Sequence, residues 1–284
     1  IQSDRQFTAV LWPRNGMCAV ARGVLLVRAM TLGASLRLAF LCVSAFAVAS
    51  CAPGDHDDDE EHDDHEHVEE SEAPVSNGTV EDAMNSSCST MSIKPLSQQI
   101  LDEMACMSPG KFVAVPSRPN LVLEPTVFPY LNAAAKDKLV AALDANPSRT
   151  MHVASMFRTV GQQYMLRRWY EKGRSGIKAA AKPGNSNHET GLAIDISSSS
   201  SWKSALTSRG FSWLGSKDPP HFDYVGAGAQ SFKGLDVKAF QRLWNRNNPS
   251  DKIAEDGAWG PQTQGRMQKS PAKGFDIGAT CSDS

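Results

Sequence analysis

Two short motifs bring together the residue types of a metal site. The residues SNHETGLAID (186–195) are followed downstream by DPPH (218–221). They contain two imidazoles and a carboxylate, on His188, Asp195 and His221. Three protein ligands and one open position are typical of catalytic zinc sites, whereas structural zinc sites close all four positions. The chain must therefore fold so that these three side chains converge, and the motifs indicate a metal-dependent hydrolase.

The neighbouring residues fit the same interpretation. Gly191 permits a tight turn into the strand that carries Asp195. Asp218 lies three residues before His221 and can act on a water at the metal as a general base, then as an acid. Asp223 faces the same side of a strand as His221, so we expect it to support the site rather than ligate the metal. The competing interpretation is a plain His–Asp hydrogen bond, with Asp218 capping a turn.

The N-terminal region has the pattern of an export signal. We assign residues 1–50 to an N-terminal extension and signal peptide, in which Arg37 precedes the apolar run 38–49. That run is too short to span a bilayer, which takes about 20 apolar residues. The sequence VASC (48–51) resembles the lipobox of bacterial lipoproteins, which implies lipidation of Cys51 and a membrane-anchored protein facing the periplasm or cell surface. Ordinary cleavage before Cys51 is the alternative, and both interpretations predict export.

Charge is distributed unevenly along the chain. Twelve acidic residues and no Lys or Arg occupy 55–72, within a segment, 51–87, that we expect to be a disordered tether. Four histidines in this tether could gather metal ions, although a solvated spacer is the simpler interpretation. Residues 73–284 carry 24 basic against 18 acidic residues, which suits an anionic target such as a cell wall. No basic, aromatic-rich motif suggests nucleic acid, and we expect a monomer.

Three cysteines lie beyond the signal and the proposed anchor. An oxidising compartment allows two of them to pair. We predict a disulfide between Cys88 and Cys106, because both flank one predicted helix. Cys281 is then the odd thiol, although the sequence also allows it as a partner.

The apolar patterns predict an α+β fold with a small antiparallel sheet, flanking helices and a small helical C-terminal segment. Helical segments, with no regular βαβ repeat, are expected at 95–104, 133–143, 159–172, 201–208, 237–245 and 261–267. Strands are expected at 111–115, 121–123, 150–157, 192–196 and 221–225. We place a peptidase domain at 88–230 and the small helical segment at 231–284, which is too short to be stable without docking.

The motifs together resemble the signature of a known enzyme family. They read Ser186-x-His188-x-x-Gly191-x-Ala193-x-Asp195 and Asp218-x-x-His221, preceded by Ser155-x-x-Arg158-Thr159 and Gln162. This pattern, over about residues 110–226, is similar to the zinc D-alanyl-D-alanine carboxypeptidases. That family belongs to the lysostaphin/hedgehog-like metallopeptidases and includes L-alanyl-D-glutamate endopeptidases.

The resemblance implies one Zn²⁺ on His188, Asp195 and His221, with Asp218 as the catalytic acid and base. It also implies that Arg158 receives a substrate carboxylate or polarises the scissile carbonyl, for which a planar guanidinium is well suited. Further substrate-binding candidates are Gln162, Ser186 and Trp213, and Tyr224 is a candidate pocket wall or core residue. Many D,D-carboxypeptidases have Glu where this chain has Asp218, so the motif does not fix which peptidoglycan stem-peptide bond is cut.

The C-terminal segment carries a second resemblance. The patterns Val237-x-x-Phe240-Gln241-x-Leu243-Trp244-Asn245 and Asp256-Gly257-x-Trp259-Gly260-Pro261-x-Thr263 resemble a three-helix peptidoglycan-binding module. The alternative is a helix that only packs on the catalytic domain. Two other functions stay open: a non-catalytic wall-binding lipoprotein with a structural metal, and a periplasmic zinc-binding protein that uses the histidines of the tether.

Overall fold

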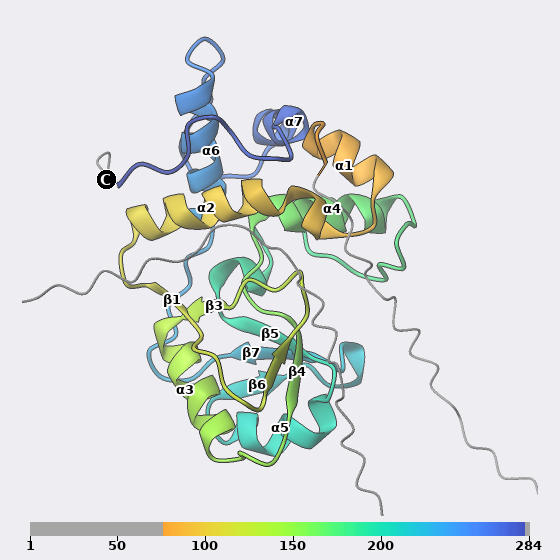
Figure 1. Ribbon diagram of the computed structural model, residues 1–284, viewed down its shortest axis with the longest axis vertical. Coiled ribbons are helices and arrows are strands. Elements are labelled where there is room, and N and C mark those ends of the chain that lie inside the picture. Colours follow the sequence, from red (N-terminus) through yellow and green to blue (C-terminus); the bar gives the residue numbers. More distant parts are fainter. Residues whose placement is uncertain (1–75, 282–284) are drawn as a thin grey trace, which may run out of the picture. The chain divides into compact units, whose positions relative to one another are not determined.

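The computed structural model describes residues 76–281 (Figure 1). The predicted signal peptide, the lipidation of Cys51 and the tether up to residue 75 lie outside these residues and stay predictions. Within the described range, no helix is both long enough and apolar enough to cross a bilayer.

A five-stranded sheet lies at the centre of the metal-site region, in the order β2-β4-β5-β7-β6. All neighbouring strands are antiparallel except β2 and β4, which run parallel. The strands are β2 (Leu121–Leu123), β4 (Met151–Ser155), β5 (Ala193–Ile196), β6 (Phe211–Trp213) and β7 (His221–Tyr224). A separate antiparallel pair joins β1 (Phe112–Ala114) to β3 (Tyr130–Asn132). The predicted α+β class is confirmed, with one parallel edge strand that the pattern did not reveal.

Two helices pack on this sheet and complete its core. They are α3 (Ala133–Asp144) and α5 (Ser199–Thr207). Leu139 of α3 and Trp202 of α5 are fully buried in one apolar cluster with Phe222 and Tyr224 of β7. Tyr224 is therefore a core residue rather than a pocket wall.

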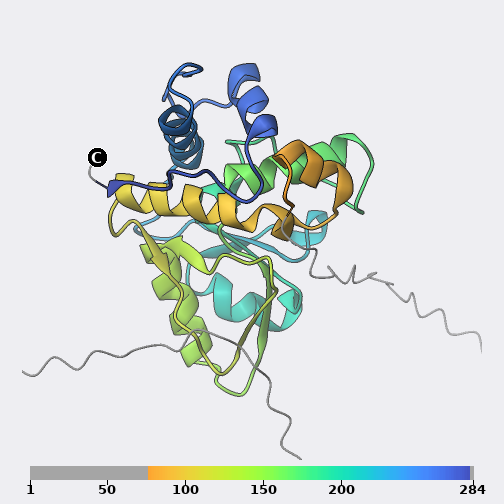
Figure 2. The same ribbon diagram turned by 45° about the horizontal axis from the view of Figure 1, so that its top comes forward.

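The remaining helices form a second, larger core. They are α1 (Val80–Ser86), α2 (Lys94–Met107), α4 (Val160–Glu171), α6 (Leu235–Asn247) and α7 (Pro261–Lys269). In both views α2 lies between α6 and the region that carries the sheet (Figure 1 and Figure 2). The predicted C-terminal segment thus shares its core with helices from the start of the described range, which supplies the docking that so short a segment needs.

A buried charge cluster fixes α6 on α2. Glu103 of α2 is fully buried, and its carboxylate pairs with Arg242 at 2.6 Å and with Arg246 at 2.9 Å. Burial works against ionisation, but the two guanidiniums outweigh it and hold the pKa of Glu103 below its ordinary value. Removing one partner from such a buried pair is strongly destabilising, because it leaves an uncompensated charge.

Helix α1 was not expected. It begins at the N-cap Thr79, whose hydroxyl accepts from the Asp82 amide while the Asp82 carboxylate accepts from the Thr79 amide. Val80 and Met84 of α1 are fully buried in the helical core. The prediction of disorder up to residue 87 is therefore wrong for 76–87, where three buried apolar positions outweigh a polar composition.

The disulfide prediction is also wrong. Cys106 pairs with Cys281, with the two Cα atoms 4.7 Å apart, and Cys88 is a free, exposed thiol beside Ser175. Cys88 and Cys106 lie at opposite ends of a segment that contains the 14-residue α2. A helix of that length spans about 20 Å. A disulfide tolerates no more than about 7 Å between Cα atoms, so flanking a helix separates two cysteines instead of pairing them.

We expect Cys281→Ser to lower the unfolding free energy by about 2–5 kcal/mol, because the bond closes a loop with a sequence separation of 175 residues. Thermal and urea unfolding of the two proteins measure the difference. Cys88→Ser is the matched control and should leave the unfolding free energy unchanged. Equal stability of Cys281→Ser and wild type under oxidising conditions would contradict the role given to this bond.

Candidate metal centre

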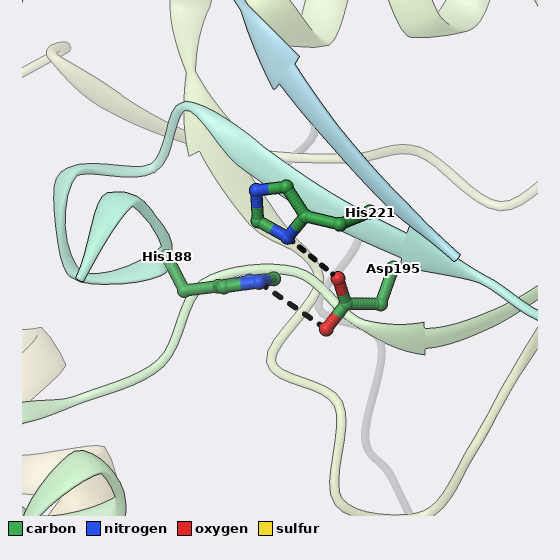
Figure 3. A group of neighbouring side chains, drawn as sticks. All are labelled: His188, Asp195 and His221. Carbon is green, nitrogen blue, oxygen red and sulfur yellow. Dashed lines mark hydrogen bonds and ion pairs between the residues drawn. The ribbon is translucent and has the colours of Figure 1, made fainter. Parts of the chain in front are cut away.

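Three side chains from separate elements converge at one end of the sheet (Figure 3). His188 lies in a short 3₁₀ turn, Asn187–Thr190, while Asp195 and His221 lie directly opposite each other on β5 and β7. One ligand atom from each residue falls within 4.8 Å of the other two. Ser155 of β4 lies opposite Asp195 on its other side, so a single cross-strand row crosses the site.

The turn that presents His188 is fixed locally. The Ser186 hydroxyl accepts from the His188 amide, and the Glu189 carboxylate accepts from the Ser186 amide, so both ends of a capping box are satisfied. Gly191 ends the turn with φ of 69°, a left-handed conformation that disfavours side chains. A Cβ at this position would also lie 2.7 Å from the Phe112 ring. The expected turn at Gly191 is confirmed.

Hydrogen bonds orient both imidazoles toward the shared centre. His188 Nδ1 contacts the Met156 carbonyl at 2.8 Å, so this nitrogen carries the proton and Nε2 faces Asp195 Oδ2 at 3.2 Å. His221 contacts Asp195 Oδ1 through Nδ1 at 2.9 Å and Asp223 Oδ1 through Nε2 at 3.0 Å. Metal-binding histidines commonly have such a carbonyl or carboxylate on the second nitrogen. The supporting position expected for Asp223 is confirmed.

The electrostatics of the three residues favour a bound cation. Burial opposes ionisation of Asp195, yet His188, His221 and Arg158 outweigh it and hold the pKa of Asp195 far below its usual range. Burial lowers the pKa of His188. Burial also opposes protonation of His221, but its bonds to Asp195 and Asp223 raise the pKa of that imidazole to about 10. The carboxylates of Asp195 and Asp223 thus favour positive charge at this position, and the two-nitrogen, one-oxygen donor set suits Zn²⁺.

Arg158 and Asp218 lie with the three ligands in one cavity of about 550 Å³. Arg158 precedes α4 and donates to Gln163 Oε1 and to Ser155 Oγ, both at 3.0 Å, while its Nη2 lies 3.5 Å from Asp195. Asp218 lies in the loop before β7, and its carbonyl accepts from the His221 amide at 3.1 Å. Burial, and next the charge of Asp195, raise the pKa of Asp218.

Of the predicted substrate-binding residues, Ser186 lines this cavity and two others do not. Gln162 is buried and closes the capping box of α4 by accepting from the Thr159 amide at 3.1 Å, which gives it a structural role. The Trp213 indole donates to the Pro219 carbonyl at 2.6 Å and thereby braces the loop that carries Asp218. Neither Gln162 nor Trp213 is positioned as a substrate contact, because the polar group of each already forms a hydrogen bond within the protein.

One wall of the cavity was not expected from the sequence. Arg167 and Tyr170 of α4 and the loop residues 179–181 line it beyond the metal ligands. Arg167 is held by Glu171 Oε1 at 2.8 Å and by the Ala180 carbonyl at 2.9 Å. No motif marks these residues.

A family match covers this region. Residues 130–227 match the model of the family described as VanY: D-alanyl-D-alanine carboxypeptidase. We refer to residues 130–227 as the VanY domain, after the family model that they match. It contains all three candidate ligands together with Arg158 and Asp218, and it confirms the resemblance drawn from the motifs.

Two solved structures are similar to the chain over parts of their length. An LdcB LD-carboxypeptidase, whose structure addresses peptidoglycan recognition, is 25% identical, with a TM-score of 0.33 over 46% of this chain and 73% of that one. The vancomycin-resistance D,D-pentapeptidase VanY from a VanB-type cassette, in complex with Zn(II), is 22% identical, with a TM-score of 0.28 over 40% of this chain and 83% of that one. Among curated proteins, none matches the chain.

The VanY domain contacts α6 through two buried carboxyls. Glu189 accepts from the Gly184 and Ser186 amides, both at 2.8 Å, and Asp236 at the start of α6 accepts from the Val237 amide at 2.8 Å. Burial raises the pKa of Glu189 to about 7. Burial, and next the proximity of Glu189, raise the pKa of Asp236 well above its ordinary value. The fold therefore favours a protonated carboxyl at this contact at neutral pH.

We expect Asp223→Asn to weaken Zn²⁺ binding by about 10–100-fold, because the amide supports His221 Nε2 less well than the carboxylate. Competition against a chromophoric chelator measures the affinity. Asp137→Asn, an exposed change on α3, is the matched control and should leave it unchanged. Equal affinities for Asp223→Asn and wild type would show that Asp223 does not support metal binding.

We expect Asp236→Asn to reduce the loss of stability as the pH rises. Below about pH 4 both carboxyls are protonated whether the chain is folded or unfolded. From there through about pH 7 the unfolded chain releases protons that the fold retains, so the unfolding free energy of wild type falls. The amide of Asp236→Asn does not titrate, so residue 236 no longer contributes to this fall in the unfolding free energy. Denaturation curves at pH 5, 7 and 8 test it, and identical pH slopes for both proteins would refute it.

Proposed function

We propose that this protein is an exported zinc metallopeptidase that hydrolyses peptide bonds in peptidoglycan stem peptides, with D-alanyl-D-alanine carboxypeptidase activity. The observation that carries the proposal is the convergence of His188, Asp195 and His221 with Asp218 and Arg158 in one cavity, inside the VanY domain. Attachment to a membrane through a lipidated Cys51 forms part of the same proposal, as does export by residues 1–50.

The donor atoms for zinc would be His188 Nε2, a carboxylate oxygen of Asp195 and His221 Nδ1. A zinc ion with three protein ligands lowers the pKa of water and polarises a carbonyl group. The remaining chemistry falls to side chains that the cavity already positions.

Asp218 suits the proton transfers. Its carboxylate lies in the cavity with the ligand residues, and its raised pKa brings it closer to neutrality, where a general base works best. It would accept a proton from the water that attacks the scissile carbonyl. The same Asp218 oxygen would then deliver that proton to the amine of the departing residue.

Arg158 suits the recognition of a terminal carboxylate. Its bonds to Gln163 and Ser155 fix the guanidinium, and burial of this cation favours an anionic partner. A carboxylate held there would place the last peptide bond of a stem peptide near the ligand residues. This arrangement supports removal of a terminal D-alanine.

A second activity, cleavage inside the stem as in L-alanyl-D-glutamate endopeptidases, has its own support. The cavity continues past the ligands to Arg167 and Tyr170, so it has room for peptide on that side. The non-catalytic alternative is less well supported, because Asp218 faces the same cavity as the metal ligands.

We expect Asp218→Asn to lower kcat for muropeptide hydrolysis by about 10²–10⁴-fold while Zn²⁺ binding is retained, because the amide can hold the loop but cannot carry the proton. Mass spectrometry of purified pentapeptide muropeptides before and after digestion measures the rate, and the mass lost identifies the bond. Asp137→Asn is the control for an Asp-to-Asn change at the surface. Undiminished hydrolysis by Asp218→Asn would overturn the assignment, as would full activity after zinc removal by a chelator.

A further inference from the structure

A second cavity adjoins the metal-site cavity on the other side of Arg167. It has a volume of about 340 Å³ and lies between α4 and residues 259–264, which precede and begin α7. We call it the α4–Trp259 pocket. Arg167 lines both cavities, so the two are neighbours along α4. The volume falls in the range of about 300–1,000 Å³ that is usual for small-ligand sites.

The walls of the α4–Trp259 pocket combine an aromatic face with hydrogen-bond donors. Trp259 is half-buried, and its ring centroid lies 5.7 Å from that of Tyr164 on α4. Arg167, Arg168 and the exposed Lys182 add three cationic donors. A flat apolar face surrounded by N–H groups suits a sugar ring, whose hydroxyl and amide oxygens accept hydrogen bonds.

Two buried polar atoms beside this pocket, the Tyr164 hydroxyl and Arg168 Nε, form no hydrogen bond of good geometry within the described residues. The Tyr164 side chain is only 1% exposed, and the polar groups that interact with its hydroxyl are the side chains of Gln268 and Arg168. A ligand that offers these atoms a better hydrogen bond would therefore be favoured in this pocket.

The spacing along α4 relates the pocket to the proposed reaction. Arg158 lies two residues before α4 and Arg167 is the eighth residue of that helix, so seven helical steps of about 1.5 Å and two non-helical residues separate them by about 10–17 Å. An extended peptide of about four residues spans the same distance. A stem peptide whose carboxyl end lies at Arg158 would therefore have its amino end, which is joined to the glycan, beside Arg167.

We propose that the α4–Trp259 pocket binds the N-acetylated amino sugar that carries the stem peptide. The inference rests on the proposed function, because the direction of the peptide is set by Arg158. It assigns the contact between the VanY domain and the C-terminal segment a role in substrate selection: the peptidase would prefer peptides that are still attached to the glycan.

The test compares kcat/KM of the full chain for a free stem pentapeptide and for the same peptide on its disaccharide. We expect wild type to favour the disaccharide-peptide by about threefold to tenfold, the range of an aromatic stacking contact. Trp259→Leu and Lys182→Gln should both bring the ratio close to one. Lys178→Gln, an exposed lysine of the same loop that does not line the pocket, is the matched control and should keep the wild-type ratio.

A binding measurement that needs no turnover separates this proposal from the proposed function. Calorimetric titration of Asp218→Asn with the peptide-free disaccharide should show binding, and adding Lys182→Gln should weaken it. If neither peptide is cleaved while the disaccharide still binds in this way, the peptidase assignment fails and the sugar site stands. Equal kcat/KM for both substrates, or disaccharide binding that is indifferent to residues 182 and 259, would overturn the sugar site.

Discussion

The carboxylate of Asp195 is the contact on which the rest of the site depends. It lies between two imidazoles, at 2.9 Å from His221 and 3.2 Å from His188, with Arg158 at 3.5 Å. His221 lies on β7, His188 in the 3₁₀ turn and Arg158 just before α4, so the carboxylate holds together three separate parts of the chain. A shift of one residue between β5 and β7 would move Asp195 and His221 to opposite faces and dissolve the site.

The helical layer determines what surrounds that centre. Arg158 directly precedes the N-cap of α4 and Arg167 lies within the helix, whose other face packs in the core that α2 and α6 share. The Glu103 cluster and the Cys106–Cys281 bond hold the C-terminal segment against α2. Residues 259–264 of the C-terminal segment therefore line a cavity next to the metal site, and the segment is not a domain packed apart from it.

The sequence predicted the local elements well where apolar periodicity was long. The expected segments at 95–104, 133–143, 159–172 and 237–245 correspond to α2, α3, α4 and α6. It missed β3 and β6, which have three residues each, and α1, which follows an acidic stretch. Short elements carry too few residues for a period to show, and their stability comes from distant partners such as the β7 strand that pairs with β6.

By itself the sequence indicated the candidate ligands His188, Asp195 and His221, because imidazole and carboxylate groups in motifs this compact match the donor set of a zinc site. It also determined the local turns, through Gly191 and the Ser186 cap. Only the tertiary structure decided the disulfide, the structural use of Gln162 and Trp213, and the second cavity beside Trp259. These features join residues far apart in the chain, and local spacing carries no information on which distant surfaces will meet.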